Sequence, residues 1–321
     1  MDKAIKDFAK QFAWKPQIKN EEKLKPFGQV VVGGMGGSHL SADLLSALDV
    51  EIPVTIHRNY GLPFLTEAQR NETLYIASSY SGNTEETIDF AKTAYERGLN
   101  LAVLAVGGKL IEFAEKNEIP RIILPDTGIQ PRSALGFSLL ALIMLLGNKK
   151  LAKELAGLST KLDPKALEMK GKELAKKLSG SVPVIYASDK NTSVAYNWKI
   201  KLNETGKIPS FYNVFPELNH NEMTGFDRAG KTKSLSDKFI FIFLSDDADH
   251  PQNRKRFEVT KKLYEDRGIK VLSYPLSGSN RSEKVFSSLL LADWTAYHTA
   301  LMYGVEAEQV PMVEEFKKLI S

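Results

Sequence analysis

One short loop carries three hydroxyl side chains, those of Ser79, Ser81 and Thr84. It follows the apolar run 74–77, which predicts a buried strand, and it precedes a segment with helical spacing. In an open parallel sheet, ligands bind beyond the carboxyl ends of the strands, where the first turn of a helix offers unpaired backbone N–H groups. Gly82 would let the backbone approach a ligand closely. These features predict a phosphate-binding loop that needs neither a lysine nor a metal ion.

The alternative interpretation of this loop is an ordinary helix cap. Asn83 would be the N-cap residue, and Glu86 would be the third helical residue of a capping box. Glu85 and Glu86 also offset the positive end of the helix dipole, which counts against an anionic ligand. The density of hydroxyl groups in so short a loop, directly after a buried strand, favours phosphate binding.

A second candidate is the glycine-rich segment 33–38, Gly-Gly-Met-Gly-Gly-Ser, which also follows an apolar run and opens a helix. A dinucleotide fingerprint would need a further glycine where this chain has His39, and the segment contains no Gly-Lys-Ser/Thr. A tight strand–helix turn would need only one or two glycines. Four of them indicate a backbone that lies against a ligand, with Ser38 donating from the start of the helix.

The elements that must position these loops alternate along the chain. Apolar runs predict strands at residues 29–32, 54–56, 74–77, 101–106, 121–124, 182–186, 239–244 and 271–274. Helical spacing predicts helices at residues 38–48, 84–97, 131–146, 191–203 and 254–267. Continuous apolar strands alternating with helices predict an α/β protein with parallel sheets covered by helices on both faces.

The length of 321 residues suits two domains. A segment rich in Lys, Leu and Ala, 149–165, marks a composition shift, so we expect domains at residues 1–155 and 156–321. Segments 74–106 and 241–276 both run strand, polar loop, helix and strand, which indicates a duplicated domain.

The second copy lacks the hydroxyl-rich loop. It carries Asp246, Asp247 and Asp249 instead. Because these acids would repel a phosphate, only the first copy is expected to bind one.

Composition narrows the function classes. Hydrophobic residues make up 43% of the chain, and the net charge of +4 is small and spread out, which gives little support for nucleic-acid binding. There is no cysteine, and the histidines lack metal-ligand spacing, so we expect neither a metal nor a disulfide. The charged N-terminus does not suit a signal peptide, and the most apolar stretch, 133–146, is too short to span a bilayer. A cytoplasmic protein without membrane contact is expected.

Five segments carry a resemblance to a known family, and they read GGMGGSHLSADLL, SSYSGNTEET, PRSALGFS, NETGKIP and PELNHNEMTGF. Over essentially the whole chain they resemble the bifunctional phosphoglucose/phosphomannose isomerases, members of the SIS (sugar isomerase) fold group. The resemblance implies two SIS-type domains, no cofactor, and interconversion of glucose 6-phosphate and mannose 6-phosphate with fructose 6-phosphate.

The resemblance also implies roles for individual residues. Phosphate would be bound by Ser79, Ser81 and Thr84, and the substrate would be contacted by Gly37, Ser38, Arg132 and His220. The catalytic roles implied are a base at Glu204, ring opening by His220, stabilisation of the reacting carbons by Arg132, and assistance from Lys317 or its neighbour Lys318.

The chemistry needs these residue types. Aldose–ketose isomerisation through a cis-enediol(ate) needs a carboxylate to move a proton between C1 and C2, a cation for the enediolate oxygens, and an acid/base for ring opening. By residue type alone, each has an ordinary alternative. Glu204 could be an exposed helix end, Arg132 a helix start, His220 a surface turn and Lys317 a helix-face lysine.

SIS isomerases are typically dimers whose sites are completed by a neighbouring subunit. The resemblance therefore implies a homodimer, with His220 donated across the interface as one arrangement. Two other functions remain open. One is a non-catalytic SIS sensor, which would keep the phosphate loop without needing Glu204, His220 and Arg132 together. The other is an isomerase for a different sugar phosphate.

Overall fold

The computed structural model describes residues 1–48 and 50–320. This part of the chain forms two compact units. We call residues 7–162 the N-terminal unit, and residues 163–320 together with residues 1–6 the C-terminal unit. Each is described by itself below.

The predicted boundary at residue 155 falls inside α7 (Lys149–Ala156). This helix packs on α6 (Leu135–Leu145) and is followed by α8 (Leu158–Lys161), which packs on the 3₁₀ helix η1 (Phe8–Ala13). Because Leu155 and Leu158 are fully buried in these contacts, the N-terminal unit continues past residue 155, to residue 162.

The N-terminal unit is built on a parallel sheet in the order β2-β1-β3-β4-β5. Its strands are β1 (Gln29–Gly33), β2 (Val54–His57), β3 (Thr73–Ser78), β4 (Asn100–Ala105) and β5 (Arg121–Ile123), and each neighbouring pair is parallel. Every residue of β3 and β4 is buried, as expected for strands covered on both faces.

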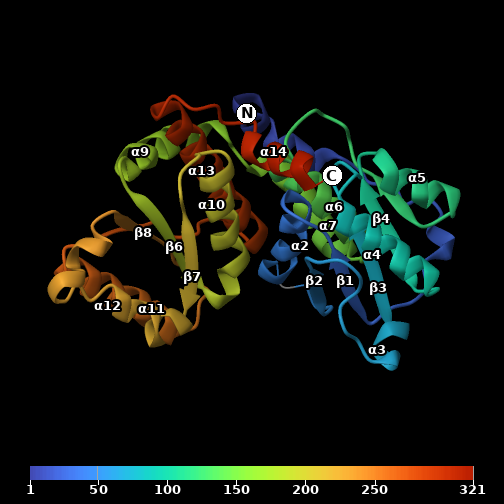
Figure 1. Ribbon diagram of the computed structural model, residues 1–321, viewed down its shortest axis with the longest axis horizontal. Helices are drawn as coiled ribbons and strands as arrows, with labels where there is room; N and C mark the ends of the chain where they lie inside the picture. The colour runs from blue at the N-terminus through green and yellow to red at the C-terminus, as the bar shows by residue number, and fades with distance from the viewer. Residues whose placement is uncertain (49, 321) are drawn as a thin grey trace. The chain divides into compact units, whose positions relative to one another are not determined.

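Helices cover both faces of this sheet (Figure 1). α2 (Gly37–Ala47) and α6 pack together on one face. α4 (Glu85–Glu96) and α5 (Gly108–Lys116) pack on the other face, where Tyr75 and Val103 of the sheet meet Phe90 and Leu110. The short helix α3 (Glu67–Asn71) precedes β3.

The C-terminal unit repeats this plan with a parallel sheet in the order β7-β6-β8-β9. Its strands are β6 (Val182–Ser188), β7 (Phe211–Phe215), β8 (Phe239–Leu244) and β9 (Lys270–Ser273). The helices are α1 (Asp2–Lys6), α9 (Glu168–Leu178), α10 (Thr192–Glu204), α11 (Glu222–Gly225), α12 (Pro251–Asp266), α13 (Arg281–Met302) and α14 (Pro311–Ile320).

One face of this second sheet is covered by α10 and α13, with α9 and α1 packed on α13. The other face is an aromatic layer in which Tyr186 and Phe243 of the sheet meet Phe257 and Tyr264 of α12. The predicted class, an α/β protein with parallel sheets covered by helices on both faces, is therefore confirmed in each unit.

The predicted duplication is also confirmed, because the order β2-β1-β3-β4 in one sheet corresponds to β7-β6-β8-β9 in the other. The matching segments 74–106 and 241–276 correspond to β3–α4–β4 and β8–α12–β9. The N-terminal unit adds α5 and β5 beyond this shared core.

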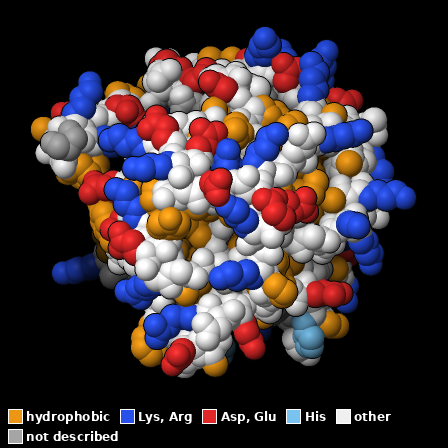
Figure 2. Space-filling view, turned by 90° about the vertical axis from the view of Figure 1, so that its right-hand side faces the viewer, with side chains coloured by type: hydrophobic (Ala, Val, Ile, Leu, Met, Phe, Trp, Pro, Cys, Tyr) orange, Lys and Arg blue, Asp and Glu red, His pale blue; other side chains and the backbone are white. Residues whose placement is uncertain are grey.

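The most apolar stretch forms α6, in which every residue except Met144 is buried. It is the core helix that its length predicts. None of the helices within residues 1–48 and 50–320 combines the length and hydropathy needed to cross a bilayer. Lys, Arg, Asp and Glu side chains are interspersed over the face drawn in Figure 2, in keeping with the small net charge of +4.

Candidate functional site

The loop between β3 and α4 has a fixed backbone. Gly82 has a φ of +70°, and a Cβ at this position would overlap the carbonyl oxygen of Gly107. Val106 donates its N–H to the Tyr80 carbonyl at 2.9 Å, and Leu110 donates to the Gly82 carbonyl at 2.9 Å. The segment after β4 therefore holds the loop in place, and glycine is the residue that fits at its turn.

The three predicted hydroxyls lie within this one loop. Ser79 Oγ and Thr84 Oγ1 are 2.9 Å apart, and Gly82 N–H donates to Ser79 Oγ at 3.1 Å. Asn83 N–H donates to Ser81 Oγ at 3.3 Å. Ser79 is buried, Thr84 is half-buried and Ser81 is exposed, so the hydroxyls extend from the protein interior to solvent.

The alternative capping box is not formed. α4 begins at Glu85, its N-cap residue is Thr84, and the Thr84 side chain makes no capping hydrogen bond. Asn83 faces away from the helix start, because its Oδ1 accepts from Lys109 N–H at 3.2 Å and its Nδ2 donates to the Ser81 carbonyl at 3.2 Å. Asn83 stabilises the loop, and the first turn of α4 keeps its N–H groups clear of an N-cap side chain.

The glycine loop between β1 and α2 packs directly on the hydroxyl loop. Ser38 is buried, its Oγ accepts from Tyr80 N–H at 2.8 Å, and its carbonyl accepts from Ser78 Oγ at 3.1 Å. An accepting hydroxyl keeps its own hydrogen, so donation from Ser38 to a ligand stays a prediction.

The other side of the glycine loop meets Arg132. A Cβ on Gly37 would lie 2.8 Å from the backbone nitrogen of Arg132, so only glycine permits this approach. Arg132 lies in the 3₁₀ helix η3 (Pro131–Ser133) just before α6, and its side chain is 2% exposed. Gln11 fixes this segment, because its Nε2 donates to the Ser133 carbonyl at 2.7 Å and its Oε1 accepts from Gly136 N–H at 3.0 Å.

The N-terminal unit thus brings together six of the predicted residues at the carboxyl edge of its sheet. They are Gly37, Ser38, Ser79, Ser81, Thr84 and Arg132. Hydroxyls, a helix N-terminus and a guanidinium on adjacent segments can bind an anion.

Glu204 is the last residue of α10 and is half-buried. Its carbonyl accepts from Lys207 Nζ at 2.5 Å, and Lys207 Nζ also bonds the Gln309 carbonyl. One turn earlier in the helix, Lys201 forms a buried ion pair with Asp293 of α13 at 2.6 Å. These contacts fix the end of α10 within the C-terminal unit.

His220 ends the 3₁₀ helix η6 (Glu217–His220), directly after β7, and is exposed. Because β6 and β7 are parallel, α10 between them runs back along the sheet. Glu204 therefore lies at the edge formed by the amino ends of the strands, and His220 lies at the edge formed by their carboxyl ends. The residue pairs from Val184–Phe211 to Ser188–Phe215 separate the two edges by about 13 Å of strand.

Two other carboxylates lie near His220. Glu222 accepts from the hydroxyl of Tyr186 at 2.5 Å and from Asn213 Nδ2 at 2.6 Å. Tyr186 is fully buried, and this burial, together with the nearby Tyr264 and Glu222, raises its pKa far above the ordinary value. Glu222 therefore satisfies a buried hydroxyl, whereas Glu217 is exposed and accepts from Asn221 Nδ2 at 2.7 Å.

Lys317 lies on α14 and forms an exposed ion pair with Glu314 at 2.8 Å. None of the residues of α14 within 311–320 is buried. The apolar side chains Met312, Phe316 and Leu319 are exposed there. In the C-terminal unit, Lys317 is thus an exposed helix-face lysine.

One motif in this unit escaped sequence reasoning. Residues 225–232, from Gly225 through Gly230 to Lys231 and Thr232, have the spacing of a phosphate-binding P-loop. A P-loop joins a strand to a helix, but here α11 ends at Gly225 and the 3₁₀ helix η7 (Gly230–Ser236) leads into β8. The match is one of spacing alone.

Among the residues that the structure describes, no three His, Cys, Asp or Glu side chains are grouped to hold a metal ion. Metal independence stays a prediction.

Comparison with known proteins identifies the family. Residues 167–320 match the family model described as bacterial phospho-glucose isomerase C-terminal SIS domain. The bifunctional phosphoglucose/phosphomannose isomerase of Aquifex aeolicus is 32% identical over 320 residues, which cover 98% of this chain and 97% of that protein. The chain belongs to the bifunctional phosphoglucose/phosphomannose isomerase family.

A second bifunctional phosphoglucose/phosphomannose isomerase, from Caldicellulosiruptor bescii, is 34% identical and covers 93% of this chain and 91% of its own length. Among solved structures, a glucosamine-6-phosphate deaminase from Thermotoga maritima aligns with a TM-score of 0.68 at 15% identity, covering 96% of this chain and 93% of its own. At that identity the likeness concerns the fold. The predicted family and the predicted SIS-type α/β fold are confirmed, and the roles of individual residues stay predictions.

Proposed function

We propose that this protein interconverts glucose 6-phosphate and mannose 6-phosphate with fructose 6-phosphate through a cis-enediol(ate), without a metal or cofactor. The observation that carries the proposal is the match, over nearly the whole chain, to bifunctional phosphoglucose/phosphomannose isomerases. A charged sugar phosphate does not cross a bilayer unaided, so we also propose a cytoplasmic location.

In this proposal the N-terminal unit binds the substrate. The phosphate accepts hydrogen bonds from Ser79, Ser81 and Thr84 at the start of α4, where the helix dipole favours an anion. Gly37 and Ser38 contact the sugar. Support comes from the rigidity of the loop, because a site that is already ordered loses less entropy when the ligand binds.

The catalytic groups are assigned as follows. Glu204 takes a proton from one of C1 and C2 and returns it to the other, and Arg132 stabilises the charge that develops on the enediolate oxygens. His220 opens the sugar ring as an acid/base. Lys317, or its neighbour Lys318, assists from α14.

The direct test is formation of fructose 6-phosphate from each aldose with EDTA present. Glucose 6-phosphate and mannose 6-phosphate differ only at C2 and share one enediol, so we expect both to be converted and the chelator to have no effect. Turnover of only one epimer would contradict dual specificity, and loss of activity in EDTA with recovery on adding Zn²⁺ or Mg²⁺ would contradict metal independence. A protein that binds these sugar phosphates without converting them would be the sensor.

We further propose a homodimer in which His220 of one copy completes the site that uses Glu204 of the other. This is supported by the positions of the two residues at opposite edges of the C-terminal sheet, too far apart to reach one sugar from a single copy. In a symmetric dimer, each of the two sites would be formed by the edge of the C-terminal sheet that carries Glu204 in one copy and the edge that carries His220 in the other.

Complementation tests this arrangement. Glu204→Gln and His220→Ala should each be nearly inactive alone, but unfolding and refolding them as an equimolar mixture should restore about a quarter of the wild-type activity. Half of the dimers would be mixed, and each mixed dimer would contain one site with both native residues. If both residues came from the same copy, every site would lack one of them, and the mixture would stay inactive.

A further inference from the structure

The loop after β8, residues 245–250, is the counterpart of the hydroxyl loop after β3. Both loops have the same length, both follow the strand at the centre of the duplicated sheet, and both lead into a helix, α4 or α12. The sequence Ser-Asp-Asp-Ala-Asp-His replaces Ser-Tyr-Ser-Gly-Asn-Thr. From the sequence, the three aspartates of this loop are expected to repel a phosphate. The structure shows that cationic side chains lie beside them.

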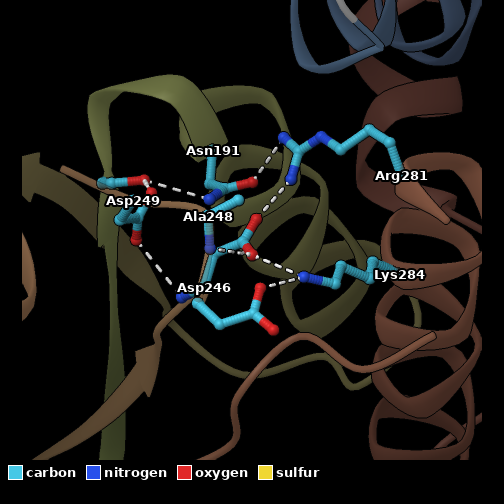
Figure 3. A network of polar contacts seen from close by, with 8 residues as sticks. Asn191, Asp246, Ala248, Asp249, Arg281 and Lys284 are labelled. Atoms are coloured by element: carbon cyan, nitrogen blue, oxygen red, sulfur yellow. Dashed lines mark hydrogen bonds and ion pairs between the residues drawn. The ribbon is translucent and has the colours of Figure 1, made fainter. Parts of the chain in front are cut away.

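Asp246 is 1% exposed and its carboxylate is fully coordinated (Figure 3). Arg281 Nη1 donates to its Oδ2 at 2.6 Å, Lys284 Nζ donates to its Oδ1 at 2.9 Å, and Ala248 N–H donates to the same Oδ1 at 3.1 Å. Arg281 and Lys284 lie on the first turn of α13. An arginine N–H, a lysine and a backbone amide converging on one carboxylate are donors of the kinds that proteins use to bind phosphate.

These donors are held by groups other than Asp246. Arg281 Nη2 donates to Oδ1 of Asn191, whose side chain is fully buried, at 2.7 Å. Asn191 Nδ2 donates to Ser188 Oγ at 3.0 Å, and Ser188 Oγ donates to Asp249 Oδ1 at 2.6 Å. The arginine would therefore keep its position if the Asp246 carboxylate were removed.

Asp246 is the anion that these cations require. Burial acts to raise the pKa of Asp246, but hydrogen bonds from Lys284 and Ala248 and the charge of Arg281 lower it to about 2, so the group is a carboxylate at neutral pH. Asp247 also pairs with Lys284, but its side chain is 79% exposed. Asp246 is thus the buried counter-ion of Arg281 and Lys284.

The two units also place an arginine at corresponding points of their topology. Arg281 begins α13, the long helix that follows the last strand of its sheet, and Arg132 lies in η3 just before α6, which has that place in the N-terminal unit. The C-terminal unit therefore has the loop, the helix start and the arginine of an anion site.

We infer that the loop 245–250 is an anion-binding site of the duplicated fold that the protein fills with its own carboxylate, Asp246, and that removing this carboxylate opens it to a phosphate group. In the native protein, each chain would then take phosphate in the N-terminal unit alone. The inference goes beyond the proposed reaction and does not depend on it.

The test uses the full chain with the hydroxyl loop already disabled by Ser81→Ala and Thr84→Ala. Into this parent we place Asp246→Ser, which supplies the short neutral side chain typical of the other loop. Inorganic phosphate binding is measured by isothermal titration and by the thermal unfolding midpoint, against chloride at equal ionic strength. We expect the added substitution to raise the phosphate affinity at least about tenfold over the parent, since hydrogen bonds to a charged group are gained.

Two controls make the result specific. Asp247→Ser in the same parent removes an exposed acid that also touches Lys284, and it should give no gain. Adding Arg281→Met to Asp246→Ser should abolish the gain, because Arg281 supplies a charged donor to the position of the Asp246 carboxylate.

Three outcomes would overturn the inference: no gain in phosphate affinity, a gain that survives Arg281→Met, or an Asp246→Ser protein that stays unfolded even in phosphate. The comparison is between each variant and its parent, so it is independent of whether the hydroxyl loop itself binds the substrate. If the hydroxyl loop does not bind phosphate, this would be seen in a different comparison: the parent would bind phosphate as well as the wild type does.

Discussion

Replacing Glu204 with glutamine is expected to lower kcat about 10²- to 10⁴-fold with little change in KM. Glutamine keeps the size of glutamate but cannot accept the proton of a C–H bond. The hydroxyl loop proposed to bind phosphate lies in the N-terminal unit and Glu204 ends α10 of the C-terminal unit, so binding should be largely spared. Steady-state kinetics with glucose 6-phosphate measures the effect. In D₂O the wild-type enzyme should place deuterium at the transferred carbon, because a carboxylate can exchange its proton with water.

The matched control for this prediction is Glu217→Gln, the same change on an exposed carboxylate of the same unit. It should leave kcat unchanged. Glu222→Gln should instead lower the unfolding temperature, because the two Glu222 oxygens accept from the buried Tyr186 hydroxyl and from Asn213 Nδ2, and an amide has one accepting oxygen. Near-wild-type turnover by Glu204→Gln would exclude Glu204 as the base, and a loss of kcat in the Glu217 variant would move the assignment there.

Replacing Thr84 with alanine is expected to raise KM for the sugar phosphate about 10- to 100-fold, and Ser81→Ala is expected to act in the same direction. Each change removes a donor to a charged group, worth about 1.5–3 kcal/mol. The value of kcat should fall less, since neither hydroxyl contacts the reacting carbons in the proposed arrangement. Thr84 Oγ1 also pairs with Ser79 Oγ, so a variant with both Ser79→Ala and Thr84→Ala should lose less binding than the sum of those two single losses.

Thr160→Ala is the matched control, because Thr160 is an exposed threonine of the same unit whose hydroxyl bonds the Gly157 carbonyl. Its KM should stay at the wild-type value. An unchanged KM in Thr84→Ala would contradict phosphate binding by the hydroxyl loop. The same assignment would be contradicted if the wild-type protein bound phosphate at the loop 245–250 and not at the loop 79–84.

The hydroxyl loop was open to prediction because its parts are neighbours in sequence. A buried strand, a glycine at a turn and a following helix place Ser79, Ser81 and Thr84 in one segment whatever the rest of the chain does. The partner of Asn83 was not open to prediction in this way. Its amide bonds Lys109, which reaches the loop only because β4 pairs with β3.

The strands also differ in whether the local sequence was enough to predict them. Buried strands such as β3, β4 and β8 are continuous apolar runs and were predicted. β7 was missed, because Phe211 and Tyr212 of this edge strand are exposed and its sequence has no clear apolar run. The P-loop spacing of residues 225–232 is the opposite case, a local pattern whose required strand is absent from the described structure before Gly225.

By itself, the sequence determined the α/β class, the duplication, the hydroxyl loop and the family resemblance, because each is written in contiguous segments with a characteristic period or spacing. Only the tertiary structure showed which cations pair with the acidic residues of the loop 245–250. Arg281 and Lys284 reach Asp246 across more than thirty residues, since α13 begins at the carboxyl edge of the sheet, after the end of β9. It also decided that Glu204 and His220 lie at opposite edges, because parallel strands force the helix between them to run back along the sheet.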